Sequence, residues 1–304
     1  MKPPRPGIRI WAVIALAACL ASCEMIEQNV EILSGGRVTA RDAQKVLETG
    51  EKIRGTFADI TEEEEYYIGR SVAALILAKY PVYGNETVIQ YLNTVGNAVA
   101  AFSDRPEIYA GYHFLALDSE EVNALSAPSG FIFVTKGLLR RCRDEEMLAL
   151  ILAHEVGHVT GKHGLQAIKK SRLADLFTFA GTEAVQRYGP AQIARLTNLF
   201  EGALSDIAEQ LIERGYDRKY EYDADAMAVA YGSRTGYEAG GIVRFLETMV
   251  NDASPAAAQG WFKTHPTAEQ RIDRINREIG SLKTAPKIDE VRTKRFKQSV
   301  GALK

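Results

Sequence analysis

The sequence predicts an α+β fold that is mainly helical and carries a small antiparallel sheet beside a helix containing HEVGH. Three observations predict this fold: long stretches place apolar residues at helical spacing, short segments between them read as strands, and the composition is that of a folded domain. Of the 304 residues, 46% are apolar and 25% are charged, which is enough to build a full core. The net charge of -2 argues against nucleic acid as a main partner.

The first 60 residues are expected to precede the globular fold. Three basic residues are followed by an apolar run at 10–20, and the sequence LASC then ends at Cys23. This layout resembles a bacterial lipoprotein signal peptide, so residues 1–22 would be removed and Cys23 would carry lipid. Residues 23–60 would form a lipid-anchored spacer with one helix, on the periplasmic side of the envelope and with the outer membrane as the expected anchoring site. An ordinary secretory signal and a short N-terminal anchor are the alternatives.

The domain expected at 61–283 begins with two helices and a sheet. A capping box opens a helix at 61–80, and a second helix covers about 86–102; both carry apolar stripes and are interpreted as scaffold. Residues 112–117 are predicted to form a strand, and 124–134 two short strands around Pro-Ser-Gly. The edge of this sheet could bind an extended substrate as an added strand, or the sheet could merely close the core.

The HEVGH motif lies on the next predicted helix, which begins after Asp144 as N-cap. Positions four apart on an α-helix differ by about 40° around the axis, so His154 and His158 point the same way and fit two corners of a tetrahedral zinc site. Glu155, about 100° round, could act there as a general base. The alternative is a pair of capped or solvated helical histidines. Gly157 costs about 1 kcal/mol relative to Ala inside a helix, which suggests that another backbone or a ligand comes close.

Two downstream candidates could supply a third metal ligand. On a continued helix His163 would lie about 140° from His158, so we expect it at the surface or behind a ligand. Glu221 and Asp225 are four apart in KYEYDADAMAVAY and share a helical face with small or apolar neighbours. Glu221 would complete a His-His-Glu set with an open fourth position, and Asp225 would hydrogen-bond a ligand histidine. A solvated acidic face is the alternative.

Together, HEVGH and a later E-x-x-x-D on another helix resemble the gluzincin metallopeptidases. The resemblance is closer to the type-1 CAAX prenyl endopeptidases and their bacterial periplasmic relatives, and it extends over about 61–275. Its further marks are Asn123-Ala124 followed by SGFIFVTKGLL, the extended motif HEVGHVTGKH, EYDAD, and THPTAEQRI. The resemblance implies a zincin-like metallopeptidase domain in which the strand at Asn123 and Ala124 borders the substrate.

The same resemblance implies a zinc ion bound by His154, His158 and Glu221, with a histidine-proline motif near the metal. That histidine is His265, and the proline after it holds it away from helical geometry. It would either stabilise the oxyanion of the tetrahedral intermediate or occupy the open zinc position and keep the enzyme idle. Arg271 would either pair with an acidic group behind the ligands or lie on a helix surface.

The function predicted from the sequence is zinc-dependent endopeptidase activity, with one zinc ion per chain, on misfolded or unassembled cell-envelope proteins. Two alternatives stay open: a zinc-containing chaperone-like or substrate-binding lipoprotein with low or latent proteolytic activity, and a structural lipoprotein without zinc. The segment 165–215 has no apolar span of about 20 residues, unlike integral-membrane members of the family. The basic segment 284–304 is expected to be a tail that is either a solvated helix or in contact with anionic lipid or a partner.

Overall fold

The structure is a computed structural model that describes residues 61–167, 201–202, 204–251, 261–265, 268–282 and 289–303. The chain divides into two compact units, and nearly all of the described residues belong to the one formed by Thr61–Ala167 and Ile207–Lys304. The predicted signal peptide and spacer lie outside the described residues, as does most of the segment 165–215. Within the described ranges, every helix is too short or too polar to cross a membrane.

A three-stranded sheet contains β1 (His113–Leu117), β2 (Ala124–Ala127) and β3 (Phe131–Thr135), in the order β1-β3-β2. β2 and β3 pair antiparallel because the short turn η1 (Pro128–Gly130) joins them as a hairpin. β1 pairs with β3 in parallel, so the sheet is mixed, whereas the sequence predicts an antiparallel one. The pattern of apolar residues locates strands, but it does not encode the direction of their partners. The mainly helical α+β class and the strand positions are confirmed.

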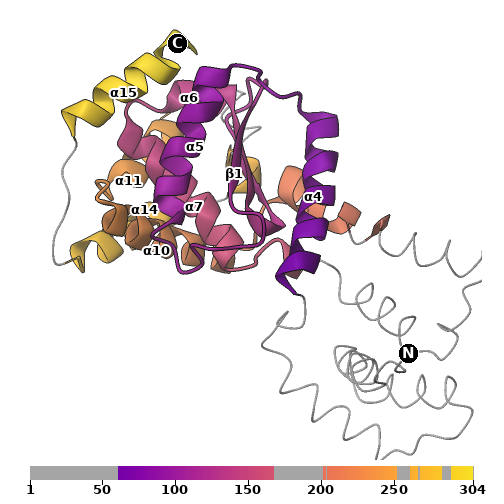
Figure 1. The fold of residues 1–304 in the computed structure, drawn as a ribbon. Helices are drawn as coiled ribbons and strands as arrows, with labels where there is room; N and C mark the ends of the chain where they lie inside the picture. The colour runs from indigo at the N-terminus through magenta and orange to yellow at the C-terminus, as the bar shows by residue number, and fades with distance from the viewer. Residues whose placement is uncertain are drawn as a thin grey trace, which may run out of the picture. The chain divides into compact units, whose positions relative to one another are not determined.

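Two helices flank the sheet: α4 (Glu62–Lys79) and α5 (Glu86–Ala100) lie on either side of it in Figure 1. α5 begins after Asn85, whose side chain accepts a hydrogen bond from the backbone N–H of Val88. It packs against β1 and against α7 (Glu145–Thr160), while α4 contacts η1 and the strands β2 and β3. Both predicted scaffold helices are confirmed to within a few residues.

The HEVGH motif lies in α7, which is buried along nearly its whole length. Asp144 caps this helix as predicted, because its side chain accepts a hydrogen bond from the N–H of Met147. α10 (Arg218–Thr235) crosses α7 closely, since a Cβ added to Gly157 would lie only 3.2 Å from the Cα of Ala224. The expected close approach of another backbone at Gly157 is confirmed, and it brings the EYDAD segment against the motif.

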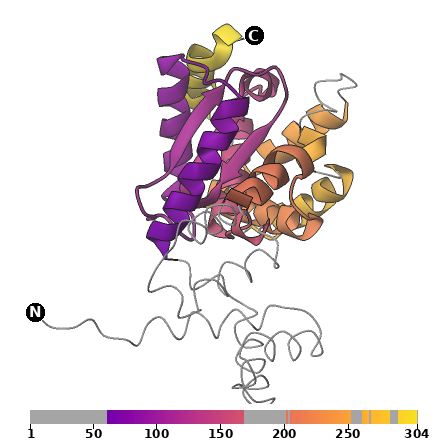
Figure 2. The ribbon, with the colours of Figure 1, turned by 90° about the vertical axis from the view of Figure 1, so that its right-hand side faces the viewer.

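The C-terminal helices complete the unit around α7 and α10. α11 (Gly241–Val250) packs against α7, and α14 (Ala268–Gly280) packs against α10 and α11. α15 (Glu290–Val300) lies on the side of α5 away from α4 (Figures 1 and 2). The sequence predicts a separate tail at 284–304, but in the structure Phe296 of α15 is fully buried in the core.

α15 is also held by charges at the first turn of α7. Arg295 donates to both carboxylate oxygens of Glu145, from Nε at 2.8 Å and from Nη2. Arg292 donates to Glu146 at 3.3 Å. Tyr91 donates a further hydrogen bond to Glu145 at 2.8 Å, so this buried acid is well paired.

Candidate metal centre

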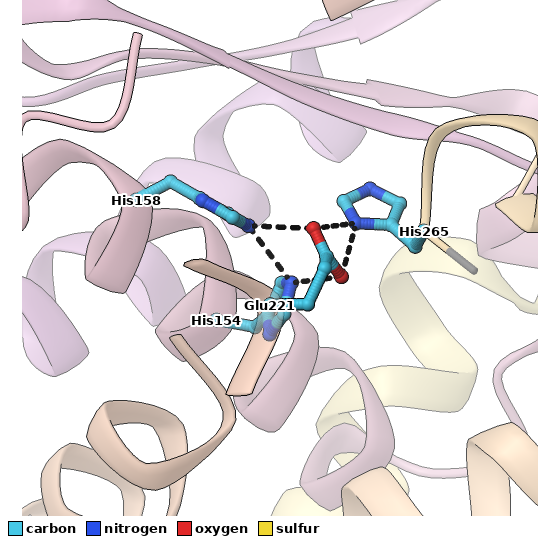
Figure 3. Close-up of side chains that lie close together, drawn as sticks. All are labelled: His154, His158, Glu221 and His265. Carbon is cyan, nitrogen blue, oxygen red and sulfur yellow. Dashed lines mark hydrogen bonds and ion pairs between the residues drawn. The ribbon is translucent and has the colours of Figure 1, made fainter. Parts of the chain in front are cut away.

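Four buried side chains from three parts of the chain converge in the described structure (Figure 3). His154 and His158 lie one turn apart on α7, Glu221 lies on α10, and His265 follows the short helix α13 (Trp261–Thr264). One ligand atom from each lies within 4.8 Å of those of the other three. Imidazole nitrogens and carboxylates are ligands that zinc accepts, so this group could hold a metal ion.

The two imidazoles of α7 point the same way, as their spacing predicts. Nε2 of His154 and Nε2 of His158 are 3.1 Å apart. Glu221 faces both rings: one carboxylate oxygen lies 3.6 Å from Nε2 of His154, and the other lies 3.3 Å from Nε2 of His158. Two nitrogens and a carboxylate thus lie close enough together to bind one ion.

Burial and neighbouring charges set the protonation of these groups. Burial raises the pKa of Glu221, but His265, Arg271 and the two α7 histidines lower it more strongly, so its pKa lies well below the usual value. Burial lowers the pKa of His158 well below its usual range, so this ring is neutral. An ionised carboxylate and a neutral imidazole are the forms that bind metal.

An ion pair of Asp225 with Arg271 lies behind His154. Oδ1 of Asp225 is 3.0 Å from Nδ1 of His154, and Arg271 donates to both oxygens of Asp225, at 2.8 and 2.7 Å. Burial lowers the pKa of His154, but Asp225 and Glu221 raise it to about 9, so a bound metal would have to displace a proton from this ring. A helix-surface position is the alternative expected from the sequence for Arg271, but its side chain is fully buried.

One more histidine, His163, lies behind His158: the Nδ1 atoms of the two rings are 2.9 Å apart. The separation of about 140° assumes that the helix continues, but α7 ends at Thr160 and Lys162 has a positive φ of 53°. The chain therefore turns back, and the N–H of His163 donates to the carbonyl of His158 at 3.0 Å. His163 is 3% exposed, which excludes the surface position.

The carboxylate of Glu155 is fully buried, and neither of its oxygens has a hydrogen-bond partner among the described residues. Nε2 of His265 lies 3.8 Å from one oxygen of Glu155. The other ring nitrogen of His265 lies 3.0 and 3.1 Å from the two oxygens of Glu221. A buried carboxylate without partners costs several kcal/mol of free energy unless a cation or water satisfies it. This unpaired acid therefore fits a metal-assisted hydrolytic centre.

Two aromatic rings that the sequence analysis does not single out line the centre. Trp261 stacks on His265, with ring centroids 4.1 Å apart, and Tyr216 stacks on His158 at 4.1 Å. The hydroxyl of Tyr216 also donates to the backbone carbonyl of Ser126 on β2, at 3.3 Å. Buried aromatic residues are common in every core, so the sequence carries no signal that distinguishes these two.

The Asn123-Ala124 segment leads into β2 close to the residues around His265. The side-chain oxygen of Asn123 accepts a hydrogen bond of 2.9 Å from the hydroxyl of Thr264, the residue before His265. Ala124 is the first residue of β2 and is buried. β2 is an edge strand of the sheet, and it contacts α7 and the π-helix η4 (Gln210–Arg214) that precedes Tyr216.

Comparison with known proteins places the same region in a protein family. The sequence profile of peptidase family M48 matches residues 87–279. All four residues of the cluster lie within this range, whereas α4 and α15 lie outside it.

Individual relatives are similar at low identity. A beta-barrel assembly-enhancing protease of Yersinia pestis is 22% identical over 237 residues, which cover 75% of this chain and 46% of that protein. The metalloprotease YcaL of Escherichia coli is 29% identical over 165 residues, 54% of this chain and 61% of that protein. A mitochondrial metalloendopeptidase of Schizosaccharomyces pombe is 23% identical over 228 residues, 73% of this chain and 63% of that protein. The chain spans less than half the length of the Yersinia protease.

Proposed function

Because this chain belongs to peptidase family M48, we propose that it is a zinc-dependent endopeptidase. The observation that carries the proposal is the buried, unpaired carboxylate of Glu155. It lies 3.8 Å from His265, a member of the cluster formed with His154, His158 and Glu221. A structural zinc site needs no such acid, whereas hydrolysis of a peptide bond needs a general base beside the metal.

His154, His158 and Glu221 would hold the zinc ion. When bound, zinc polarises the carbonyl of the scissile bond and lowers the pKa of water toward about 7. The two imidazoles and the carboxylate each offer one atom within 4.8 Å of the others. Three protein ligands with a fourth position for substrate would be the catalytic rather than the closed structural pattern.

Glu155 would act as the general base. Its carboxylate accepts the proton of the attacking water and then passes it to the leaving amine. No residue in the described ranges donates a hydrogen bond to it, so both oxygens are available for this transfer. Asp225 would hold His154 in the tautomer that presents Nε2 to the metal, and Arg271 keeps Asp225 ionised and oriented.

His265 would act on the oxyanion or as the fourth metal ligand. Its ring is held between the stacked Trp261 and the carboxylate of Glu221. Nε2 has no hydrogen-bond partner among the described residues and lies toward Glu155. A donor there stabilises the tetrahedral intermediate, while a nitrogen bound to zinc would block the position that substrate needs. The two roles predict opposite effects of removing the ring.

An extended substrate would add to the outer edge of β2. The other edge of the sheet, β1, is closed: the side-chain amide of Asn93 bonds both backbone polar groups of Phe114, at 2.7 and 3.2 Å. The N–H of Tyr83 also donates to the carbonyl of Ala116 at 2.8 Å. β2 lies on the side of α7 and η4. Its Ser126 carbonyl, which accepts from Tyr216, would be the point at which substrate displaces a protein contact.

Cell-envelope proteins are the proposed substrates, and lipid on Cys23 the proposed anchor to the periplasmic face of the outer membrane. The similarity to beta-barrel assembly-enhancing proteases supports the location in the cell envelope, and the LASC segment supports the lipid anchor. Within the family, EYDAD and THPTAEQRI favour the bacterial relatives of the type-1 CAAX prenyl endopeptidases.

The test measures zinc content and cleavage of casein by the full chain in detergent. We expect one zinc ion per chain, and we expect Glu155→Gln to keep zinc while losing most hydrolysis, because the amide cannot accept the proton. A Glu155→Gln variant that cleaves at the wild-type rate would contradict the proposal. His265→Ala decides between its two roles: a faster enzyme indicates a blocking ligand, and a slower one indicates an oxyanion donor. Zinc without cleavage in any form would favour the binding lipoprotein.

A further inference from the structure

The two histidines of HEVGH have unlike partners behind them. Nδ1 of His154 faces the carboxylate of Asp225 at 3.0 Å, whereas Nδ1 of His158 faces another imidazole, that of His163, at 2.9 Å. No carboxylate or backbone carbonyl takes this position among the described hydrogen bonds of His158. The proposed function gives His163 no task, although the residue is buried beside the cluster.

For Nε2 of His158 to bind a metal, that nitrogen must carry a lone pair, so the ring proton must be on Nδ1. A buried N–H needs an acceptor. Nδ1 of His163 is at hydrogen-bond distance and can accept, in which case His163 carries its own proton on Nε2. The pair then fixes which nitrogen of His158 faces the cluster, and in which direction the ring points.

The turn after α7 holds His163 in this position. Its N–H donates to the carbonyl of His158, and Lys162 keeps a positive φ with its ammonium 3.2 Å from the buried Glu65 of α4. A Cβ added to Gly161 would lie 2.4 Å from Nε2 of His163, so only glycine leaves room for the ring. The ring of Tyr220 packs against the imidazole, with centroids 4.6 Å apart.

We propose that His163 is a positioning residue that fixes the tautomer and orientation of His158 and thereby strengthens metal binding. The inference rests on the proposed function, because it takes His158 as a zinc ligand. Partners behind a metal ligand contribute about 10–100-fold to metal affinity, and this is the scale of the effect expected here.

The experiment measures the zinc dissociation constant of the full chain by competition with chelators. His163→Leu removes the acceptor, and we expect zinc to bind about 10–100-fold more weakly. His163→Asn places its side-chain oxygen near the position of Nδ1, so it should recover most of the affinity. The Co²⁺-substituted protein gives an independent readout: the visible absorption of the Leu variant should differ from wild type, and that of the Asn variant should resemble it. His113→Leu, at an exposed histidine on β1, is the matched control.

The outcomes separate the two proposals. If the wild type binds no zinc, the proposed function fails. If the wild type binds zinc and His163→Leu binds it within twofold, or His163→Asn binds no better than the Leu variant, only the role of His163 fails. Thermal unfolding of the metal-free variants reports any loss of packing. Should the Leu variant not fold, Gly161→Ala tests the same contact by displacing the ring, and unchanged zinc affinity there overturns the inference.

Discussion

At the scale of single residues, the buried charges of the centre differ in their partners: Glu155 has none among the described residues, whereas Arg271 has two acids. Arg271 is fully buried and lies between two acids: it holds both oxygens of Asp225, and its Nη1 is 3.2 Å from Glu221. Burial lowers the pKa of Arg271, but Asp225 and Glu221 raise it above its ordinary value, so the guanidinium stays charged. Without this cation both buried carboxylates would lose a positively charged partner.

Replacement of Arg271 should therefore be costly. We expect Arg271→Leu to lower the free energy of unfolding of the metal-free protein by about 3–5 kcal/mol, because it leaves a buried charge without its partner. Arg271→Lys should lower the free energy of unfolding by less, since the positive charge remains and only the two-hydrogen-bond contact with Asp225 is lost. Urea denaturation followed by circular dichroism measures both.

Arg277→Leu, at an exposed position of the same helix, is the control and should change stability by less than about 0.5 kcal/mol. A Leu variant at 271 that is as stable as this control would show that the ion pair does not hold the centre together.

Spacing in the sequence predicts those site residues that share a helix. His154 and His158 are four residues apart, and so are Glu221 and Asp225. Side chains four apart on an α-helix lie close together on one face. His163 could not be placed in this way, because the position of its ring depends on where α7 ends and on the positive φ of Lys162. Trp261 and Tyr216 reach the centre only through tertiary packing, which no local pattern encodes.

At the scale of elements, the centre depends on how closely α10 lies against α7. Gly157 lies on α7 between His154 and His158, against the backbone of α10. A Cβ added there would be 3.3 Å from the carbonyl oxygen of Ala224. The sequence predicted this approach from the unfavourable position of a glycine inside a helix. It did not predict the parallel pairing of β1 with β3, because strand direction depends on the path of the connecting chain.

Gly157→Ala should move α10 away from α7 and weaken the metal site. A rigid backbone stands opposite the new methyl group, so overpacking of about 1–3 kcal/mol should exceed the helix-propensity gain of about 1 kcal/mol. We expect weaker zinc binding, measured by chelator competition, together with a lower melting temperature.

Gly280→Ala, at the end of α14 where an added Cβ meets nothing within 4 Å, is the matched control and should leave both quantities unchanged. Equal zinc affinity in Gly157→Ala and wild type would mean that the helix spacing does not limit the metal site.

At the scale of the whole molecule, metal binding and folding should be linked. Two histidines and Glu221 come from helices about sixty positions apart in sequence, so an ion that binds all three stabilises only the folded chain. At free zinc 100-fold above the dissociation constant, the gain is about 2.7 kcal/mol.

Removal of zinc with a chelator should therefore lower the melting temperature, and added zinc should restore it, as measured by differential scanning calorimetry. In Glu221→Gln the difference in melting temperature between the zinc-bound and the chelator-treated protein should be much smaller. A wild-type melting temperature that does not respond to the chelator would contradict the linkage between metal and fold.

The contact between α15 and the first turn of α7 bears on the order in which the fold is completed during synthesis. The acids of α7 are paired by Arg292 and Arg295, which follow their partners by 146 and 150 positions. A chain leaving the ribosome exposes α7 long before α15, and domains fold as units once their parts are available. Until α15 has been translated, the buried acids at the start of α7 lack these cations, so the helix that carries His154 and His158 should be held less firmly in the nascent chain.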